Sequence, residues 1–422
     1  MGRGRASGVD RDGAVTDRSG LPAYRWIDDQ REFDAFLGAA ASTPTYALDT
    51  EFHRERTYYA HLALLQLAAG DDIVVVDPLA VDVAPLRGLL DSDSVCLMHA
   101  SSQDLEILER SCGTVPRHLV DTQVAAGFVG LGSPGLGVLL QRRLGVNLPK
   151  ADRLTDWLRR PLREEARVYA ATDVAYLDQL WASLRDELEK RGRLAWALDE
   201  CDEIRRRHRE PADPELAWWR IKEARRLKGR ARGVAQEVAA WRERRARHLD
   251  RPVRHVLPDL AVVAIAERPP RSRNDLSKVR GLDGRHLKAG AAEDLMSAVR
   301  SGVDLPEREL RLPPRDGVDS TFRPAVTLAS AWVSQLSRDA ALDASLVATR
   351  ADIEGLVRGD DSSRLLSGWR ADVAGLPVKR LLEGTAALAF EGEGRLVLEA
   401  RSHQPPPGVD DVPSPGPSGS DG

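Results

Sequence analysis

The segment YALDTEFHRE, residues 46–55, has the pattern of a buried strand that ends with two carboxylates, Asp49 and Glu51. Side chains alternate along a strand, so these two acids point to the same face. Neighbouring carboxylates repel each other and resist joint ionisation. The pair therefore either lies in water without a function or has a cation between its members.

Length and composition limit the classes of protein to which this chain can belong. A chain of 422 residues is too long for one ordinary core, and its apolar fraction of 42% and charged fraction of 30% are typical of globular domains. No apolar run approaches the ~20 residues needed to cross a bilayer, and the N-terminus lacks the apolar core of an export signal. Three scattered cysteines form neither a disulfide framework nor a zinc motif. We expect a cytoplasmic protein of two or three domains, with no membrane association and no obligate protein partner evident.

Positive charge is concentrated in one region. The whole chain has a net charge of −4, whereas residues 204–254 contain seventeen Lys and Arg against seven Asp and Glu, a local charge of +10. One basic module in a mildly acidic protein is a common arrangement for binding a polyanion. The alternative is a solvated, arginine-rich helical surface without a partner.

The hydrophobic pattern changes along the chain from α/β to helical. Strand patterns occupy residues 45–52, 61–70, 71–78 and 94–100, helix patterns occupy 29–40, 83–90 and 101–113, and an apolar pair around a Glu/Gly turn predicts a hairpin at 387–400. The remaining segments are mainly helical. The predicted division is a disordered N-terminus (1–21), an α/β domain (22–195), a helical domain (213–302), a linker (303–317), a C-terminal domain (318–402) and a disordered tail (403–422).

Two further segments place acids where their side chains can converge with the first pair. Asp104 falls in the first turn of a helix that follows a strand, and Tyr169 and Asp173 are four residues apart on one helix face. Each has a structural alternative, since Asp104 can complete a helix cap and the other two can be a core aromatic and an exposed acid. Four converging carboxylates need cations, and such oxygen ligands select Mg²⁺ or Mn²⁺ over zinc. The ordered occurrence of all these residues favours a metal-dependent active site.

Five segments together resemble the ribonuclease D family of the DEDD exonuclease superfamily, in the variant with tyrosine in the third motif. They are DTEFHRERTYYAHLALLQL (49–67), MHASSQDLEIL (98–108), DTQVAAGFVG (121–130), LTDWLRRPL (154–162) and YAATDVAYL (169–177). The resemblance covers about residues 22–302. It implies an α/β N-terminal exonuclease domain of RNase H-like fold, with a mixed sheet flanked by helices. One or two small all-α domains of HRDC type follow it. The implied activity is 3′–5′ hydrolysis of RNA that releases nucleoside 5′-monophosphates.

The resemblance also implies a catalytic role for each of these side chains. Asp49 would bridge two divalent cations, Mg²⁺ or Mn²⁺. Glu51 and Asp173 would complete the site of the ion that holds the attacking water, and Asp104 would support the second ion. Tyr169 would orient the water, with its phenol neutral at physiological pH because its reference pKa is ~10. Two ions ~4 Å apart can stabilise both the entering and the leaving oxygen.

Predicted substrate contacts lie close to these motifs. Phe52 either stacks on the terminal base or faces the core. Lys150 and Arg160 are expected to hold phosphates, and Trp157 to support them by packing or stacking. We predict structural roles for Asp121 and for the histidines near the motifs, His53, His61 and His99. The string GLGSPG lacks the strand–turn–helix context of a dinucleotide site.

Residues 213–302 look like the HRDC domain, a helical module that the family shares with RecQ-type helicases. Its arginine clusters predict phosphate contacts that hold RNA without sequence preference. The predicted RNA-positioning patch consists of Arg225, Arg226, Lys228, Arg230, Arg232, Arg242, Arg244, Arg245 and Arg247. The tryptophans of this module, Trp218, Trp219 and Trp241, are expected in its core.

The predicted function is that of a metal-dependent 3′–5′ exoribonuclease that trims RNA with a free 3′ end, such as tRNA precursors or another stable RNA. One alternative is a DNA 3′–5′ exonuclease of the same superfamily, because no residue distinguishes ribose from deoxyribose directly. Another is a catalytically dead RNA-binding scaffold, against which the intact set of acids argues.

Overall fold

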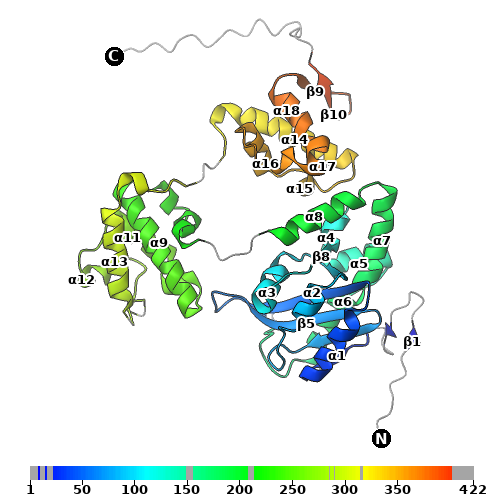
Figure 1. Cartoon of the computed structure of the whole chain (residues 1–422). Helices are drawn as coiled ribbons and strands as arrows, with labels where there is room; N and C mark the ends of the chain where they lie inside the picture. Colours follow the sequence, from blue (N-terminus) through cyan, green and yellow to red (C-terminus); the bar gives the residue numbers. More distant parts are fainter. Residues whose placement is uncertain are drawn as a thin grey trace. The chain divides into compact units, whose positions relative to one another are not determined.

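The computed structural model describes residues 8–9, 15–16, 22–148, 155–207, 213–284, 286–288, 290–313 and 317–401 (Figure 1). The chain forms two compact units, Met1–Ala126 with Ser133–Pro314, and Gly127–Gly132 with Arg315–Gly422. The predicted disorder of the two termini concerns residues outside this description, apart from two short paired strands, β1 (Gly8–Val9) and β2 (Val15–Thr16). No described helix combines the length and the apolar character needed to span a membrane.

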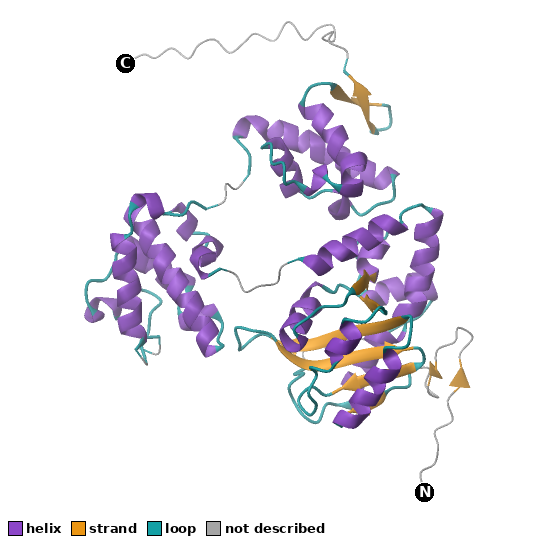
Figure 2. Cartoon of the chain, in the orientation of Figure 1, coloured by secondary structure: helices purple, strands orange, loops and turns teal. Residues whose placement is uncertain are grey.

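Six strands of the first unit form one mixed sheet with the order β3-β6-β5-β4-β7-β8. Their bounds are β3 Arg25–Ile27, β4 Thr45–His53, β5 His61–Ala69, β6 Asp72–Val76, β7 Val95–Met98 and β8 His118–Asp121. The interior strand β4 runs antiparallel to β5 and parallel to β7. Helices flank the sheet (Figure 2), so the predicted architecture of the N-terminal domain is confirmed.

Alternating apolar residues let helices bury both faces of this sheet. The helices are α1 Gln30–Ala40, α2 Leu86–Leu90, α3 Ser102–Cys112, α4 Thr122–Gly127, α5 Leu136–Leu144, α6 Glu164–Ala175, α7 Leu177–Lys190 and α8 Leu194–Arg206. Leu48, Leu65 and Leu67 share one core with apolar residues of α1, α2 and α3. Both α6 and α7 contact β4. The strand that carries Asp49 is therefore held between helices.

The structure differs from the sequence prediction at the edges of this domain. The edge strands β3 and β8 were not predicted, because three or four residues are too few to show an alternating pattern. At the C-terminal end, Ile204 of α8 belongs to the same core as the sheet. The Cys201 thiol lies 3.2 Å from the backbone N of Asp121 on β8. The folded domain thus continues past the predicted boundary at residue 195.

The helical module that follows is built around one long helix. Its elements are η1 Pro214–Arg220, η2 Ala224–Arg226, α9 Gly229–Leu249, α10 Val253–Val256, α11 Asp259–Glu267, α12 Arg273–Leu276, α13 Ala291–Asp304 and η3 Glu307–Glu309. Trp218 and Trp241 lie in its core, as predicted. Helices α9 and α13 approach so closely that a Cβ on Gly302 would lie 2.5 Å from the Cα of Val234. Only glycine fits this contact.

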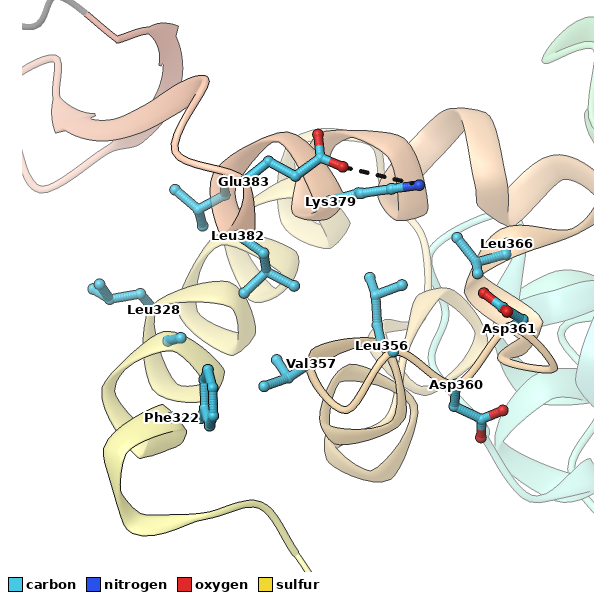
Figure 3. A pocket seen from close by; sticks show the side chains of 13 residues that line it. Phe322, Leu328, Leu356, Val357, Asp360, Asp361, Leu366, Lys379, Leu382 and Glu383 are labelled. Atoms are coloured by element: carbon cyan, nitrogen blue, oxygen red, sulfur yellow. Dashed lines mark ion pairs between the residues drawn. The ribbon is translucent and has the colours of Figure 1, made fainter.

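The second unit is mainly helical and ends in a hairpin, as predicted. It contains η4 Ser320–Phe322, α14 Arg323–Asp339, α15 Ala344–Val347, α16 Arg350–Val357, η5 Arg364–Leu366, α17 Gly368–Arg370, the π-turn η6 Ala371–Gly375, α18 Leu376–Leu382, β9 Ala386–Phe390 and β10 Leu396–Ala400. An apolar pocket of about 610 Å³ is lined by residues from α14, α16 and α18, among them Leu328, Val357 and Leu382 (Figure 3). That this unit is a second HRDC-like domain stays a prediction.

Candidate active site

The two acids of the opening segment lie in one pocket with the other predicted catalytic side chains. The pocket has a volume of about 340 Å³. Its lining consists of Asp49, Thr50, Glu51, Phe52, His99, Ala100, Gln103, Asp104, Leu136, Tyr169 and Asp173. These residues come from β4, from α3 and the turn before it, and from α5 and α6. The structure therefore brings together all five residues for which the sequence predicts catalysis.

Four consecutive residues of β4, Asp49 to Phe52, line the pocket, and the pairing of β4 with β5 is irregular at this point. The register between β4 and β5 shifts between Glu51 and Phe52. The residue without a partner is Ala63 of β5, because Glu51 pairs with Leu64 and Phe52 with Leu62. Such a bulge bends the strand pair and increases its twist at this end of β4. The ring of Phe52 lines the pocket, and the guanidinium of Arg54 lies 5.7 Å from the ring centre. The alternative that Phe52 faces the core does not hold.

Asp104 is held by a contact that the sequence did not reveal. It is buried, and its Oδ1 accepts a hydrogen bond of 2.5 Å from the hydroxyl of Thr50 on β4. The expected helix cap is absent, since the Ser101 hydroxyl instead donates to Asp121. Asp121 also accepts the backbone N–H of Ala100, whose φ of 59° is left-handed. The structural role predicted for Asp121 is thus to hold the turn that aims α3 at the pocket.

Helix α6 contributes the remaining pair. Tyr169 and Asp173 share one face of the helix, as predicted, and both line the pocket, where burial raises the pKa of the carboxylate and the phenol, to a smaller extent, lowers it. The indole ring of Trp157 stacks on Tyr169, with ring centres 6.5 Å apart and an interplanar angle of 30°. The phenol is therefore held between an acid and an aromatic ring.

The pocket raises the pKa of every carboxylate in it. Burial is the largest cause and raises the pKa of Glu51 to about 8, of Asp173 to about 7 and of Asp104 to about 6. Burial, followed by the negative charges of Asp104, Asp173 and Glu51, places the pKa of Asp49 well above its ordinary range. Burial also raises the pKa of Tyr169, so its phenol stays protonated at neutral pH. A bound cation would stabilise the ionised form of carboxylates whose pKa is raised in this way.

The donor set fits divalent cations. Four carboxylates supply hard oxygen ligands of the kind that Mg²⁺ and Mn²⁺ prefer, and their mutual repulsion falls when a cation lies between them. Within the described ranges, no group of three acid, His or Cys side chains already closes around a common point. The structure thus shows a shared acidic pocket, and cation binding would draw its carboxylates together.

Of the two residues predicted to hold phosphates, the structure describes Arg160 only. Lys150 lies outside the described residues. Arg160 donates to both carboxylate oxygens of Asp77, each over 2.6 Å, and to the carbonyl oxygens of Ala63 and Trp157. This guanidinium is half-buried and fully occupied by protein acceptors. In this structure, Arg160 is an internal clamp, which corrects the prediction of a free phosphate ligand.

Two of the three histidines, His99 and His61, have partners within the protein, and a structural role for His53 stays a prediction. The His99 ring lies 2.9 Å from the Thr122 hydroxyl and 3.1 Å from the Pro134 carbonyl oxygen, so both nitrogens have partners. The His61 ring lies 2.8 Å from Asp250. Residues 130–135 follow helix α4 and not a strand, which excludes the dinucleotide-binding arrangement.

The predicted basic patch is only partly available as a surface. Arg242 is 3% exposed, and it donates to the Leu257 carbonyl and to Asp259, so it does not belong to the patch. Arg244, Arg245 and Arg247 contact Glu215, Asp294 and Tyr58, in that order, while Arg225 and Arg232 donate to backbone carbonyls. Arg226, Lys228 and Arg230 are exposed, with no ion pair among the residues described. The free charge lies around the N-terminus of α9.

A second cationic surface of this module was missed because its residues are spread over a loop and a short helix. A groove of about 590 Å³ is lined by four exposed cations, Arg268, Arg271, Lys278 and Arg280, none of which has an ion pair within the described ranges. Two acids, Glu267 and Asp275, also line the groove, and the carboxylate of Asp275 is used locally in the capping box with Ser272. The two surfaces together make this module the most cationic part of the unit.

Comparisons with known proteins agree with this geometry. The 3′-5′ exonuclease family matches residues 24–189, and the HRDC domain family matches residues 231–299. The ribonuclease D of Jannaschia sp. (strain CCS1) is 36% identical over 377 residues, which cover 87% of this chain and 97% of that protein. The ribonuclease D of Escherichia coli (strain K12) is 34% identical over 371 residues, which cover 85% of this chain and 98% of that protein.

Solved structures lead to the same family. The crystal structure of Escherichia coli RNase D, described as an exoribonuclease involved in structured RNA processing, superposes with a TM-score of 0.77 at 33% identity and covers 86% of this chain and 99% of that one. A protein from Bifidobacterium adolescentis shares the fold, with a TM-score of 0.67 at 23% identity over 87% of this chain and 98% of that one. With relatives at 34–36% identity over most of both chains, this protein belongs to the ribonuclease D family and is a 3′–5′ exoribonuclease of the DEDD superfamily.

Proposed function

We propose that this enzyme trims the 3′ ends of structured RNA, such as tRNA precursors, and that Asp49, Glu51, Asp104, Tyr169 and Asp173 are its catalytic residues. One observation carries the assignment of these residues: four carboxylates and a phenol from distant segments line one pocket that raises the pKa of every one of them. Perturbed acids gathered in a cleft are typical of catalytic sites. Structured RNA is proposed because the Escherichia coli relative is described as processing it.

The acids would hold the divalent cations that this superfamily uses, and we propose two ions, Mg²⁺ or Mn²⁺. When bound, such ions neutralise charge on the scissile phosphate and activate water. Asp49, at the centre of the acidic set, would contact both ions, and Glu51, Asp104 and Asp173 would complete the ligands. Tyr169 keeps its proton and orients a water molecule by hydrogen bonding. Phe52 offers a ring face to the terminal base.

The HRDC module would hold the body of the RNA while the pocket works on its end. The exposed cations around the start of α9, Arg226, Lys228 and Arg230, and those of the groove between α11 and α12 are suited to phosphate contacts. Such contacts add affinity without sequence preference and weaken as salt rises. The HRDC module would thus provide affinity for the RNA, and the acidic pocket would provide the hydrolysis.

The proposal is tested with a stem-loop RNA that carries a single-stranded 3′ tail, compared with a DNA of the same sequence. With Mg²⁺ or Mn²⁺ we expect stepwise loss of tail nucleotides as 5′-monophosphates, slowing at the stem. Equal degradation of the DNA would favour the DNA exonuclease. Release of nothing from either substrate, with RNA still bound, would favour the scaffold.

The Asp77–Arg160 pair gives a prediction that separates a clamp from a phosphate ligand. The clamp fixes the turn carrying Trp157, whose ring stacks on Tyr169. We expect Asp77→Asn and Arg160→Lys each to lower kcat about tenfold on a short RNA and to destabilise the fold by about 2 kcal/mol, the range for hydrogen bonds to charged groups. The measurements are steady-state kinetics and urea unfolding. A phosphate-ligand role would instead raise KM in Arg160→Lys and spare Asp77→Asn.

A further inference from the structure

The loop that follows β4 is held by contacts with the HRDC module. Residues 54–60 connect β4 to β5, and the carboxylate of Asp250 at the end of α9 receives three hydrogen bonds from this region. The backbone N–H groups of Tyr58 and Tyr59 donate to its Oδ1 over 3.1 and 3.0 Å, and the His61 ring lies 2.8 Å from its Oδ2. Partial burial raises the pKa of Asp250, but the Tyr59 backbone and His61 outweigh it, so the pKa is lowered and the carboxylate is ionised.

The side chain of Tyr58 extends this contact into the module itself. Its ring packs against the HRDC core, and its hydroxyl donates to the buried carboxylate of Glu243. The guanidinium of Arg247 donates to the same hydroxyl over 3.1 Å and lies 5.7 Å from the ring centre. A residue of the exonuclease domain is thus part of the packing of α9.

The left-handed backbone conformation of Asp250 indicates that its side chain contributes contacts that glycine could not. The residue ends α9 with φ of 47° and ψ of 51°, a left-handed conformation that glycine adopts most easily. Asp tolerates this region better than most residues but still less well than glycine. A residue that only ended the helix would gain from being glycine. The carboxylate, which reaches amides some 190 positions earlier in the chain, is what aspartate adds.

The same loop is also tied to the catalytic helix α3. Arg54 pairs with Glu106 over 2.7 Å, and the guanidinium of Arg110 stacks 3.5 Å from the centre of the Tyr59 ring. Helix α3 carries Asp104, and β4 carries Asp49 and Glu51 immediately before the loop. One loop therefore links two elements of the acidic pocket to the end of α9.

We propose that Asp250 and Tyr58 form a latch that fixes the RNA-holding module against the strand and helix of the catalytic pocket, which makes Asp250 a positioning residue for long substrates. This rests on the proposed function of the module. The latch lies at the C-terminal end of α9, and the exposed cations lie at its N-terminal end, about 30 Å away for a helix of 21 residues. Releasing the latch leaves the cations in place but removes the contacts that fix the module to the loop after β4. An RNA that contacts both parts then loses the advantage of a fixed geometry.

The most informative variant is Asp250→Gly, which suits the left-handed backbone and removes the side chain that carries the carboxylate. Asp250→Asn and Tyr58→Phe are milder changes should the glycine variant fold poorly, and Asp304→Asn is a matched control on an exposed acid of the same module. Hydrogen exchange resolved to single amides reports the latch directly. We expect faster exchange at Tyr58 and Tyr59 in Asp250→Gly, with the amides of α9 unchanged and the control like the wild type.

Kinetics then test what the latch does. For a stem-loop RNA with a long tail, we expect Asp250→Gly to raise KM on the order of tenfold, with kcat unchanged and a tetranucleotide degraded at the normal rate. Faster exchange at Tyr58 and Tyr59 together with an unchanged KM for the long RNA would overturn the positioning role. Unchanged exchange at both amides would show that the latch does not exist. Loss of activity on the tetranucleotide would show that Asp250 serves only the fold of the pocket. If the wild type degrades no RNA, the proposed function fails, and the exchange result still decides whether the latch exists.

Discussion

Asp49→Ala should lower kcat for release of the 3′-terminal nucleotide by about 10³-fold or more. Charge stabilisation by metal ions contributes several kcal/mol to such reactions, and each 1.36 kcal/mol is a factor of ten. Asp49 is the acid whose pKa responds to all three other carboxylates of the pocket. Its loss therefore removes the group at the centre of the set. Single-turnover cleavage of a tailed stem-loop RNA measures the effect.

Two controls separate this effect from damage to the fold or to binding. Asp71→Asn removes an exposed acid from the turn between β5 and β6 and should leave kcat within twofold. The affinity of Asp49→Ala for the RNA body should stay close to that of the wild type, because the cations of the HRDC module are untouched. An Asp49→Ala enzyme with more than a tenth of wild-type kcat would rule out the proposed role of Asp49.

The second large effect concerns stability in the absence of metal. The folded state holds protons on Asp104, Asp173 and Glu51 up to about pH 6, 7 and 8, whereas the unfolded chain loses them near 3.8 for Asp and 4.5 for Glu. The stability linked to these groups is therefore complete below about pH 4 and is lost as pH rises to about 8. The metal-free protein should unfold more easily at pH 8 than at pH 6 for this reason.

Asp49→Asn isolates this effect from the rest of the protein. The folded wild type must keep Asp49 protonated or bury its charge beside the other acids, and this cost grows as pH rises above the pKa of Asp in the unfolded chain. Asn has no such cost, so the variant should melt at a higher temperature than the metal-free wild type, and the difference should grow from pH 5 to pH 8. Relief of about 1 kcal/mol corresponds to a shift of about 2–4 °C for a domain of this size. Calorimetry in a chelator measures the difference. Adding Mn²⁺ should stabilise the wild type most at pH 8 and the variant little. A Tm difference that is flat with pH would exclude coupling among the carboxylates.

The sequence predicted which of the candidate catalytic side chains share a face, because local patterns determine this. The alternation of β4 placed Asp49 and Glu51 on one face, and the i, i+4 spacing placed Tyr169 beside Asp173. Long apolar segments likewise defined the interior strands. These features depend on a few neighbouring residues, and tertiary structure leaves them intact.

The features that were missed depend on contacts between distant segments. The hydrogen bond from Thr50 to Asp104 and the occupation of Arg160 by Asp77 join residues 54 and 83 positions apart. The β-bulge at Ala63 is a property of the pair formed by β4 and β5, and the sequence of β4 alone gives no sign of it. Arginine composition predicted a patch that included Arg242, but burial decides which cations stay free, and burial requires the packed helices.

The number of bound Mn²⁺ ions tests most directly whether Asp49, Glu51, Asp104 and Asp173 jointly bind divalent cations. Electron paramagnetic resonance titration of the protein, with an RNA whose terminal linkage resists hydrolysis, gives the number and affinity of bound ions. We predict two Mn²⁺ per wild-type chain and loss of at least one in Asp49→Asn. The same number of ions bound with the same affinity in both proteins would contradict joint binding by the four acids.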